Sequence, residues 1–414
     1  MQLNHTGYIN LIFISVISTI LLSFSAFALT IGVVHDNAAE RYNFFEIKNS
    51  FHALYPDIPI EFIGLPSAKY KLQVNDWLTS ETGPDVLFWY GGMRLKQFIR
   101  QGYIENLDGL STELNWQQNF SSTALQTAKY KDSIYAIPVS YYQWGIYYNK
   151  KILKQFNIAP PSNWKDFLAA CKALKNGRFE PIALGSAEPW VLAAWFDYLN
   201  LRLNGLDFHQ NLLIGDIPFT DQRVIKVFEY WAELINKKYF LSGHQRLNRN
   251  EAMPYLFRDL SAFILNGNSL SNRIPANLEQ NIGFMPFPEI APEHAGYEDA
   301  PMDVFFVRAS SKNKKDAKTF ITYLSQADVQ TKYNKYAAGY PPNIASSISE
   351  NLFSKAGLQL LQNAKGLAQF FDRDSESDFS EPALAVFAEF MKNPNIEVTV
   401  AKLEQLRQSK LLDK

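Results

Sequence analysis

The sequence predicts an α/β fold divided between two lobes. Between residues 29 and 89, short apolar runs alternate with segments of helical periodicity, and this β-α-β-α-β order is typical of an open, mostly parallel sheet. Residues 29–414 are also more than one hydrophobic core usually holds, so about two domains are expected. No repeat or low-complexity linker divides the sequence. We therefore expect two lobes interleaved by several chain crossings.

The predicted first lobe begins with three strands. Residues 29–34, 58–63 and 85–89 are short apolar runs of the kind that a parallel sheet buries. Apolar residues at helical spacing separate these runs. The helices expected between them cover 44–54 and 68–80.

The rest of the chain continues to alternate strands and helices. A further helix is expected from Trp164 to Leu174, capped by Ser162 or Asn163. The other strands expected lie at 133–138, 144–148, 260–265, 282–285 and 304–307. The other helices expected lie at 224–235, 314–336, 382–392 and 397–411.

The first 28 residues are predicted to be a cleaved secretory signal peptide. Residues 9–22 are almost entirely apolar, and small residues follow at 23–28 at the spacing of a cleavage site. The alternative is an uncleaved anchor, because residues 9–28 are just long enough to span a bilayer and no Lys or Arg precedes them. Cys171 is the only cysteine, which excludes an internal disulfide and a lipid-carrying cysteine after the cleavage site. A soluble periplasmic protein is expected.

Composition and motifs exclude several function classes. A formal net charge of −1 leaves no electrostatic footprint for nucleic acid or an anionic membrane. The six histidines lack the spacing of zinc ligands, and no nucleotide-binding or nucleophile motif is present, so no metal or cofactor is expected. Residues 372–378 alternate carboxylates like a calcium loop but lack its Gly and its last Glu. They are interpreted as a solvated acidic loop.

Several segments carry a family resemblance in their order along the chain. They are GPDVLFW (83–89), IENLDGL (104–110), IYYNKKIL (146–153), APPSNWKDF (159–167), AFILNGNS (262–269), GFMPFPE (283–289) and GYPPN (339–343). Together they resemble the family 1 extracellular solute-binding proteins, the sugar receptors of ABC importers in the maltose-binding protein family. The resemblance extends over nearly the whole chain after residue 28.

The resemblance implies a type II periplasmic-binding-protein fold, with mixed sheets, flanking helices and a multi-strand hinge. Residues 29–138 would form the first part of lobe 1 and 139–300 most of lobe 2. Residues 301–414 would cross the hinge, return to lobe 1 and end in helices. The implied protein is a monomeric receptor, not an enzyme, that closes over a small sugar and delivers it to ABC permease subunits in the inner membrane.

A sugar pocket needs aromatic platforms for the ring and carboxylates or amides for the hydroxyl groups. Glu188-Pro189-Trp190 resembles a Glu-Pro-aromatic element of the family, in which the carboxylate holds hydroxyls and the ring stacks. The alternative is an exposed loop beside a core tryptophan. Trp195 and Tyr198 follow at helical spacing and are expected in the core.

Further candidates follow strand ends and turns. Ligands bind beyond the carboxyl ends of parallel strands, where Asp36 and Trp89 stand, although Trp89 could instead pack between the lobes. Strand alternation puts Tyr142 and Trp144 on one face, toward the cleft or the core. The remaining candidates are Asn268 and Ser269 after the Asn-Gly turn, Asp303 before a strand, and Tyr340 on the far wall.

The ligand class is narrowed but not fixed. Ser269 stands where the family often has an aromatic residue, which argues against a maltose-like ligand. Many Trp and Tyr residues and few basic candidates, apart from Arg41 and Arg94, favour a neutral mono- or oligosaccharide over a phosphate or uronate.

Two other functions stay open. A secreted glycoside hydrolase or lyase would need two carboxyl groups flanking the bond, and Glu188 with Asp36 or Asp303 could supply them. A sensory receptor would present the sugar to a membrane kinase or chemoreceptor instead of a permease.

Overall fold

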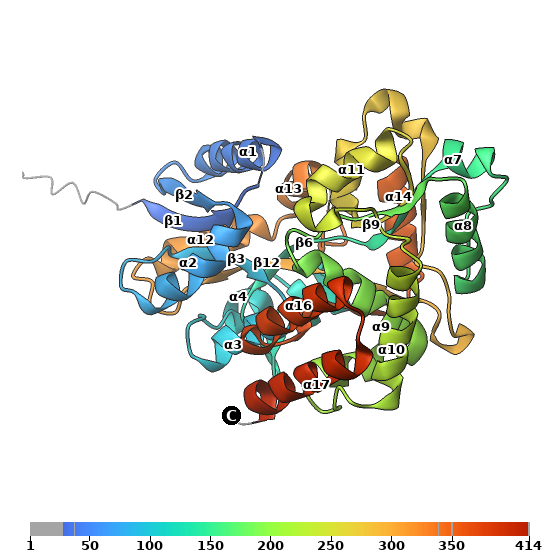
Figure 1. Ribbon diagram of the computed structural model, residues 1–414. Coiled ribbons are helices and arrows are strands. Elements are labelled where there is room, and N and C mark those ends of the chain that lie inside the picture. Colours follow the sequence, from blue (N-terminus) through green and yellow to red (C-terminus); the bar gives the residue numbers. More distant parts are fainter. Residues whose placement is uncertain (1–27, 37, 338, 349–350, 413–414) are drawn as a thin grey trace, which may run out of the picture.

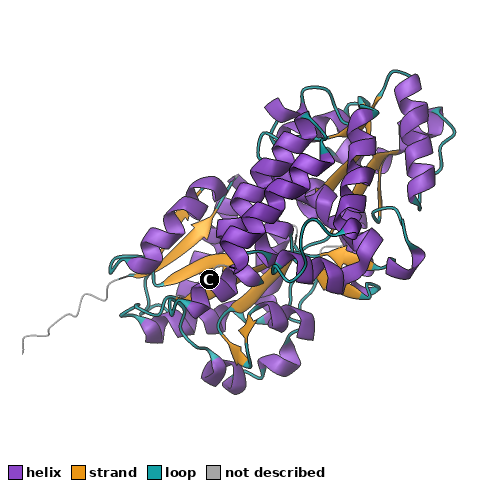
Figure 2. Cartoon of the chain, turned by 60° about the horizontal axis from the view of Figure 1, so that its bottom comes forward, coloured by secondary structure: helices purple, strands orange, loops and turns teal. Residues whose placement is uncertain are grey.

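The computed structural model describes residues 28–412 except 37, 338 and 349–350, and it divides into two lobes (Figure 1). The predicted signal peptide lies outside the described residues. Within the described part, no helix combines the length and apolar character needed to cross a membrane. Figure 2 shows a group of strands in each lobe with helices around it, so the predicted α/β class is confirmed.

A five-stranded mixed sheet forms the centre of the first lobe, in the order β2-β1-β3-β12-β6. Its strands are β1 (Leu29–Val34), β2 (Ile60–Leu65), β3 (Val86–Tyr90), β6 (Ile137–Tyr141) and β12 (Met302–Val307). β1 runs parallel to β2 and β3, which confirms the predicted β-α-β-α-β unit, whereas β12 is antiparallel to β3 and β6. β2 begins two residues later than predicted because Pro59 has no N–H to donate to a ladder. Its carbonyl instead accepts from the Leu29 amide.

Helices cover both faces of this sheet. They are α1 (Ala38–Leu54), α2 (Ser67–Thr79), α3 (Met93–Arg100), α12 (Lys314–Leu324), α13 (Ala327–Ala337) and the short α4 (Asp108–Glu113), α5 (Trp116–Asn119) and α6 (Ser122–Thr127). The helical segment expected at 314–336 consists of two helices, α12 and α13, which meet near Ser325. The carbonyl of Ser325, which a continuing helix would use, instead accepts from the Asn343 side chain at 2.9 Å.

The second lobe has a four-stranded sheet in the order β10-β7-β9-β8. Its strands are β7 (Trp144–Asn149), β8 (Glu180–Ala183), β9 (Ser261–Gly267) and β10 (Ile282–Met285), and its helices are α7 (Lys150–Gln155), α8 (Trp164–Asn176), α9 (Trp190–Leu213), α10 (Gln222–Asn236), α11 (Arg249–Phe257) and α14 (Leu352–Gln362). The predicted cap of α8 is confirmed, since the Asn163 side chain accepts from the Asp166 amide. Trp195 and Tyr198 are fully buried, as predicted.

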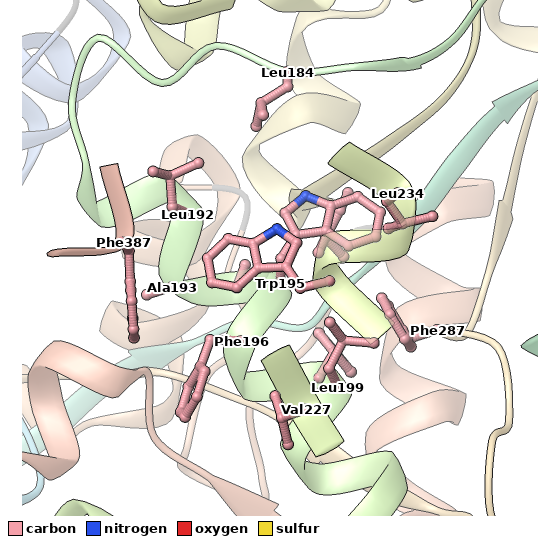
Figure 3. Close-up of a cluster of buried hydrophobic side chains, with 14 of the residues drawn as sticks. Leu184, Leu192, Ala193, Trp195, Phe196, Leu199, Val227, Leu234, Phe287 and Phe387 are labelled. Carbon is pink, nitrogen blue, oxygen red and sulfur yellow. The ribbon is translucent and has the colours of Figure 1, made fainter. Parts of the chain in front are cut away.

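The C-terminal helices complete the core of the second lobe. After a short parallel pair, β11 (Tyr297–Asp299) with β13 (Gly366–Ala368), the chain forms α15 (Phe371–Asp374), α16 (Ser377–Lys392) and α17 (Ile396–Arg407). Figure 3 shows Phe387 of α16 in one cluster with Trp195 and Phe196 of α9. Residues 301–414 are therefore shared between the lobes. β12, α12 and α13 belong to the first lobe, and α16 and α17 cover the second.

Candidate functional site

A cavity of about 210 Å³ lies between the two lobes. Its lining comes from both hydrophobic cores and from the segments that join them. The first lobe contributes Val34, Asp36, Glu40, Asn43, Phe44, Ser67, Lys71, Phe88, Tyr90, Ser140, Asp303 and Tyr333. The second lobe and the junction contribute Tyr142, Trp144, Trp190, Arg249, Ser269, Phe370, Asp372 and Arg373.

Aromatic rings form the second-lobe wall of the cavity. Trp190 begins α9 and stands nearly perpendicular to Trp144, at a centroid distance of 6.1 Å. Phe370 contacts both rings, with its centroid 5.0 Å from that of Trp144 and 5.8 Å from that of Trp190. Trp144 is 1% exposed, whereas Trp190 is only partly buried. Trp190 therefore offers the accessible ring, and Trp144 supports it from the core.

An arginine joins the first lobe to the junction at the floor of the cavity. The guanidinium of Arg373 lies 4.2 Å from the ring centre of Tyr90 and donates to Tyr142 Oη at 2.9 Å. It also pairs with the Asp303 carboxylate at 3.2 Å. Burial raises the pKa of Asp303 to about 6, although Arg373 opposes this rise. At neutral pH, Asp303 is therefore an ionised acceptor that is already held in place.

A second ion pair stands beside the first. Lys71 of α2 and Asp372 of α15 are 3.2 Å apart, and Arg94 approaches the same carboxylate at 3.5 Å. Burial alone would raise the pKa of Asp372, but Lys71, Arg94 and Arg373 outweigh it and lower the pKa to about 2. Asp372 is therefore ionised at any physiological pH and links α15 to the first lobe.

The first-lobe rim carries two carboxylates and an amide. Asp36 follows β1, and its Oδ1 accepts from the Ser67 amide at 2.8 Å. Glu40 Oε2 in turn accepts from the Asp36 amide. Asn43 donates to the Tyr333 carbonyl, while its Oδ1 has no hydrogen-bond partner among the described residues. These oxygens are acceptors of the kind that ligand hydroxyl groups require.

The structure brings six of the ten predicted site residues to this cavity: Asp36, Tyr142, Trp144, Trp190, Ser269 and Asp303. Tyr142 and Trp144 both line the cavity, but they do not share a strand, because Tyr142 lies in the connection between β6 and β7 and Trp144 begins β7. Trp144 was expected to face either the cleft or the core, and it does both, since it lines the cavity and belongs to the second-lobe core.

Trp89 does not line the cavity, because it lies on the opposite face of its strand. Successive side chains of a strand point to opposite faces, and Phe88 and Tyr90 are the members of β3 that reach the cavity. Trp89 instead packs in the first-lobe core, 5.1 Å from the ring of Phe98, and is 3% exposed. Tyr90 occupies the place that the sequence suggested for Trp89.

Glu188, Asn268 and Tyr340 also lie outside the cavity lining. Glu188 is exposed on the loop before α9. Tyr340 Oη donates to Gln143 Oε1 at 2.7 Å, and Gln143 Nε2 donates to Asn268 Oδ1 at 3.1 Å. Asn268 and Tyr340 are both buried. They therefore belong to a hydrogen-bond chain around the segment that joins β6 to β7.

The sequence interpretation missed most of the charged lining: Lys71, Arg249, Asp372 and Arg373. The expected solvated loop at 372–378 is wrong, because it begins with α15 and buries Asp372 to 4% and Arg373 to 8% exposure. The partners of these two residues come from distant parts of the chain, so local composition gives no sign of them. The one available signal was the Phe370-Phe371 pair just before them, which anchors α15 in the second-lobe core. Arg94 is buried behind Asp372 and is not part of the lining.

Comparisons with known proteins agree with this architecture. A family model described as bacterial extracellular solute-binding protein matches residues 36–331, more than half of the chain. The multiple sugar-binding protein of Streptococcus mutans serotype c is 24% identical over 301 residues, covering 70% of this chain and 69% of that protein. The melibiose/raffinose/stachyose-binding protein MelE of Bacillus subtilis is 22% identical over 368 residues, covering 83% of this chain and 80% of that protein.

Solved structures share the fold over almost the whole chain. The bacterial solute receptor AcbH, described as having an exclusive preference for β-D-galactopyranose, matches with a TM-score of 0.85 at 24% identity and covers 94% of this chain and 99% of its own. A chitin oligosaccharide binding protein matches with a TM-score of 0.83 at 20% identity and covers 93% of this chain and 100% of its own. The resemblance seen in the sequence is thus confirmed, and this chain belongs to the bacterial extracellular solute-binding proteins.

Proposed function

We propose that this protein is the substrate-binding receptor of an ABC importer and captures a sugar between its lobes. The observation that carries the proposal is the cavity itself, in which the accessible Trp190 ring faces hydroxyl-binding groups from both lobes. Asp36 and Asp303 come from the first lobe and Ser269 from the second. A ligand that contacts both lobes would select the closed arrangement over an open one. Relatives named for sugars support the same class of ligand.

The proposed binding set follows the lining of the cavity. Trp190 stacks on a sugar ring, with Tyr90 and Tyr142 as further aromatic surfaces. Asp36, Asp303 and Ser269 bind hydroxyl groups. Trp89, Glu188, Asn268 and Tyr340 are left out, because none of them reaches the cavity.

The working location is the periplasm or the cell exterior, and the partners are permease subunits in the membrane. The family description, extracellular solute-binding protein, supports export. Cleavage of residues 1–28 and a monomeric state remain part of the proposal. N-terminal sequencing of the exported protein tests the cleavage, and light scattering tests the monomer.

A thermal-shift screen of purified protein against mono-, di- and oligosaccharides tests the sugar assignment. Binding to the folded state stabilises it by RT ln(1 + [L]/Kd), about 2.7 kcal/mol at a hundredfold excess over Kd. We expect at least one sugar to raise the melting temperature. A folded protein that responds to no sugar in the panel would contradict the assignment.

Incubation with oligosaccharides separates binding from catalysis. We propose that the protein releases its ligand intact. The carboxyl pair that hydrolysis would need is incomplete, because Glu188 is outside the cavity and Asp303 is held in an ion pair with Arg373. Chromatography after long incubation should show only the starting sugar, whereas shorter products would establish a hydrolase or lyase.

A partner-capture experiment separates transport from sensing. We expect the sugar-loaded protein to bind ABC permease subunits, whereas binding to a membrane kinase or chemoreceptor instead would establish a sensory receptor.

A further inference from the structure

Arg249 is the basic residue of the cavity that lacks a carboxylate partner. It is the first residue of α11, and its Nη1 donates to Ser269 Oγ at 3.1 Å. Its guanidinium lies 5.5 Å from the ring centre of Trp190. Among the described residues, no carboxylate oxygen comes within 4.0 Å of it, the limit for an ion pair.

The other two cations of the lining are already neutralised. Arg373 pairs with Asp303 and Lys71 pairs with Asp372. Arg94, behind the lining, holds both Asp372 and Glu381. Among the cations of the described lining, Arg249 is thus the one that is not held in an ion pair.

Arg249 carries its charge at a position that is only partly exposed to water. Desolvation lowers its pKa, yet a guanidinium stays protonated at physiological pH. Asp36 and Glu188 influence it electrostatically from beyond ion-pair distance, the first from across the cavity and the second from an exposed loop. Arg249 is therefore a charged group that a ligand in the cavity can reach and that has no ion pair with another described residue.

The surroundings of Arg249 suit a planar anion. One of its donors is bound to Ser269, which fixes the side chain, and its contact with Trp190 is to the ring. The guanidinium presents five N–H donors in a fork that matches a carboxylate in two parallel hydrogen bonds. A carboxylate there would lie beside the ring of Trp190, on which a sugar would stack.

We propose that the ligand is an acidic sugar, with its carboxylate on Arg249 and its ring on Trp190. This inference rests on the proposed function and names the ligand class within it. The hydroxyl groups of the same sugar face Asp36 and Asp303 of the first lobe. The sequence-based preference for a neutral sugar assumed few basic residues near the ligand, whereas Lys71, Arg249 and Arg373 all line the cavity.

Matched sugar pairs test the proposal on the unmodified protein. Affinities for D-galacturonate and D-galactose, for D-glucuronate and D-glucose, and for trigalacturonate and a neutral trisaccharide are measured by calorimetry. We expect the acidic member of at least one pair to bind about 10- to 100-fold more tightly, the range of a charge-assisted hydrogen-bond pair. A neutral member that binds as tightly or more tightly in every pair overturns the inference and leaves the sugar-receptor function intact. Failure of every sugar to bind overturns both.

Substitutions at Arg249 locate the selectivity. Arg249→Gln should remove most of the preference for the acidic sugar, measured as the ratio of the two affinities within a pair, and Arg249→Lys should restore part of that ratio. Arg246→Gln is the matched control, because Arg246 is exposed in the loop just before α11 and does not line the cavity. A folded Arg249→Gln protein, checked by circular dichroism, that keeps the full preference overturns the assignment.

Discussion

At the scale of single residues, exposure separates the roles of the two tryptophans in the cavity wall. Trp190 is partly buried at the start of α9, whereas Trp144 is enclosed by Trp190, Phe370 and the second-lobe core. Trp190→Ala should therefore weaken sugar binding about 10-fold or more and lower the melting temperature little. Calorimetry and thermal unfolding of the same preparation measure both effects.

Trp144→Ala serves as the comparison. Removing a large ring that is 1% exposed should cost about 3–5 kcal/mol in the free energy of unfolding. If Trp190→Ala behaved like Trp144→Ala and left affinity unchanged, Trp190 would be a core residue and not a binding platform.

The same scale shows where prediction from sequence is limited. β3 ends at Tyr90, one residue later than the apolar run suggested. Successive side chains of a strand alternate between the cavity and the core, so an error of one residue selects the wrong side chain. Tyr90 is thus in the cavity and Trp89 is not. Asp36 and Trp190 were found because a strand end and a family motif mark them. Arg373 was missed because its partners Asp303 and Tyr142 are remote in sequence.

At the scale of elements, the short helix α15 fastens the junction to the first lobe. Asp372 meets Lys71 of α2 and Arg94 of α3, and Phe371 anchors the helix in the second-lobe core. Periodicity and Pro or Gly signals predicted the β-α-β-α-β order at the start of the chain and the positions of α8, α10, α16 and α17. The role of α15 did not, because it depends on ion pairs that only the tertiary fold creates.

Asp372→Asn should destabilise the protein by about 3 kcal/mol, since it leaves the buried Arg94 and the partly exposed Lys71 without their shared carboxylate. Arg94 still pairs with Glu381 in this variant. The loss in the free energy of unfolding should therefore lie at the lower end of the range for broken buried ion pairs. Urea unfolding at pH 7 measures it. Asp378→Asn is the control, because Asp378 is exposed in the same segment and its substitution should change stability by no more than about 0.5 kcal/mol. Equal stabilities of the two variants would contradict the role given to α15.

At the scale of the whole molecule, buried carboxylates at the junction of the lobes predict a pH dependence of stability. Asp197 and Asp299 are fully buried, and three of their four carboxylate oxygens have no hydrogen-bond partner among the described residues. Burial raises the pKa of both carboxyl groups. The charge of Asp299 raises the pKa of Asp197 further, and the charge of Asp374 does the same for Asp299. Burial also raises the pKa of Asp303 and of Asp374 to about 6.

The sign follows from proton uptake. Between the unfolded pKa near 4 and the higher folded values, the native state binds more protons than the unfolded state. Burial lowers the pKa of His209, which lies 3.7 Å from Asp197, to about 3, so this histidine makes stability rise with pH up to its unfolded pKa of about 6.5. Above that range the buried carboxyl groups dominate, and stability should fall as pH rises from about 6.5 to 8. Asp299→Asn should raise stability at pH 8 by about 1–2 kcal/mol and flatten this slope, because it removes a buried ionisable carboxyl group. Urea unfolding at pH 6.5, 7.25 and 8 checks the slope, and a wild-type protein that is more stable at pH 8 than at pH 6.5 would contradict it.

The central claim is that one sugar binds between the two lobes. Isothermal titration of the wild-type protein with the sugar that stabilises it most in the thermal-shift screen tests this most directly. The account predicts saturable binding of one ligand per chain, weakened by Trp190→Ala and unaffected by Trp89→Phe, a conservative change in the first-lobe core. Saturable binding that Trp190→Ala leaves unchanged, or no saturable binding of any sugar to the folded protein, would contradict it.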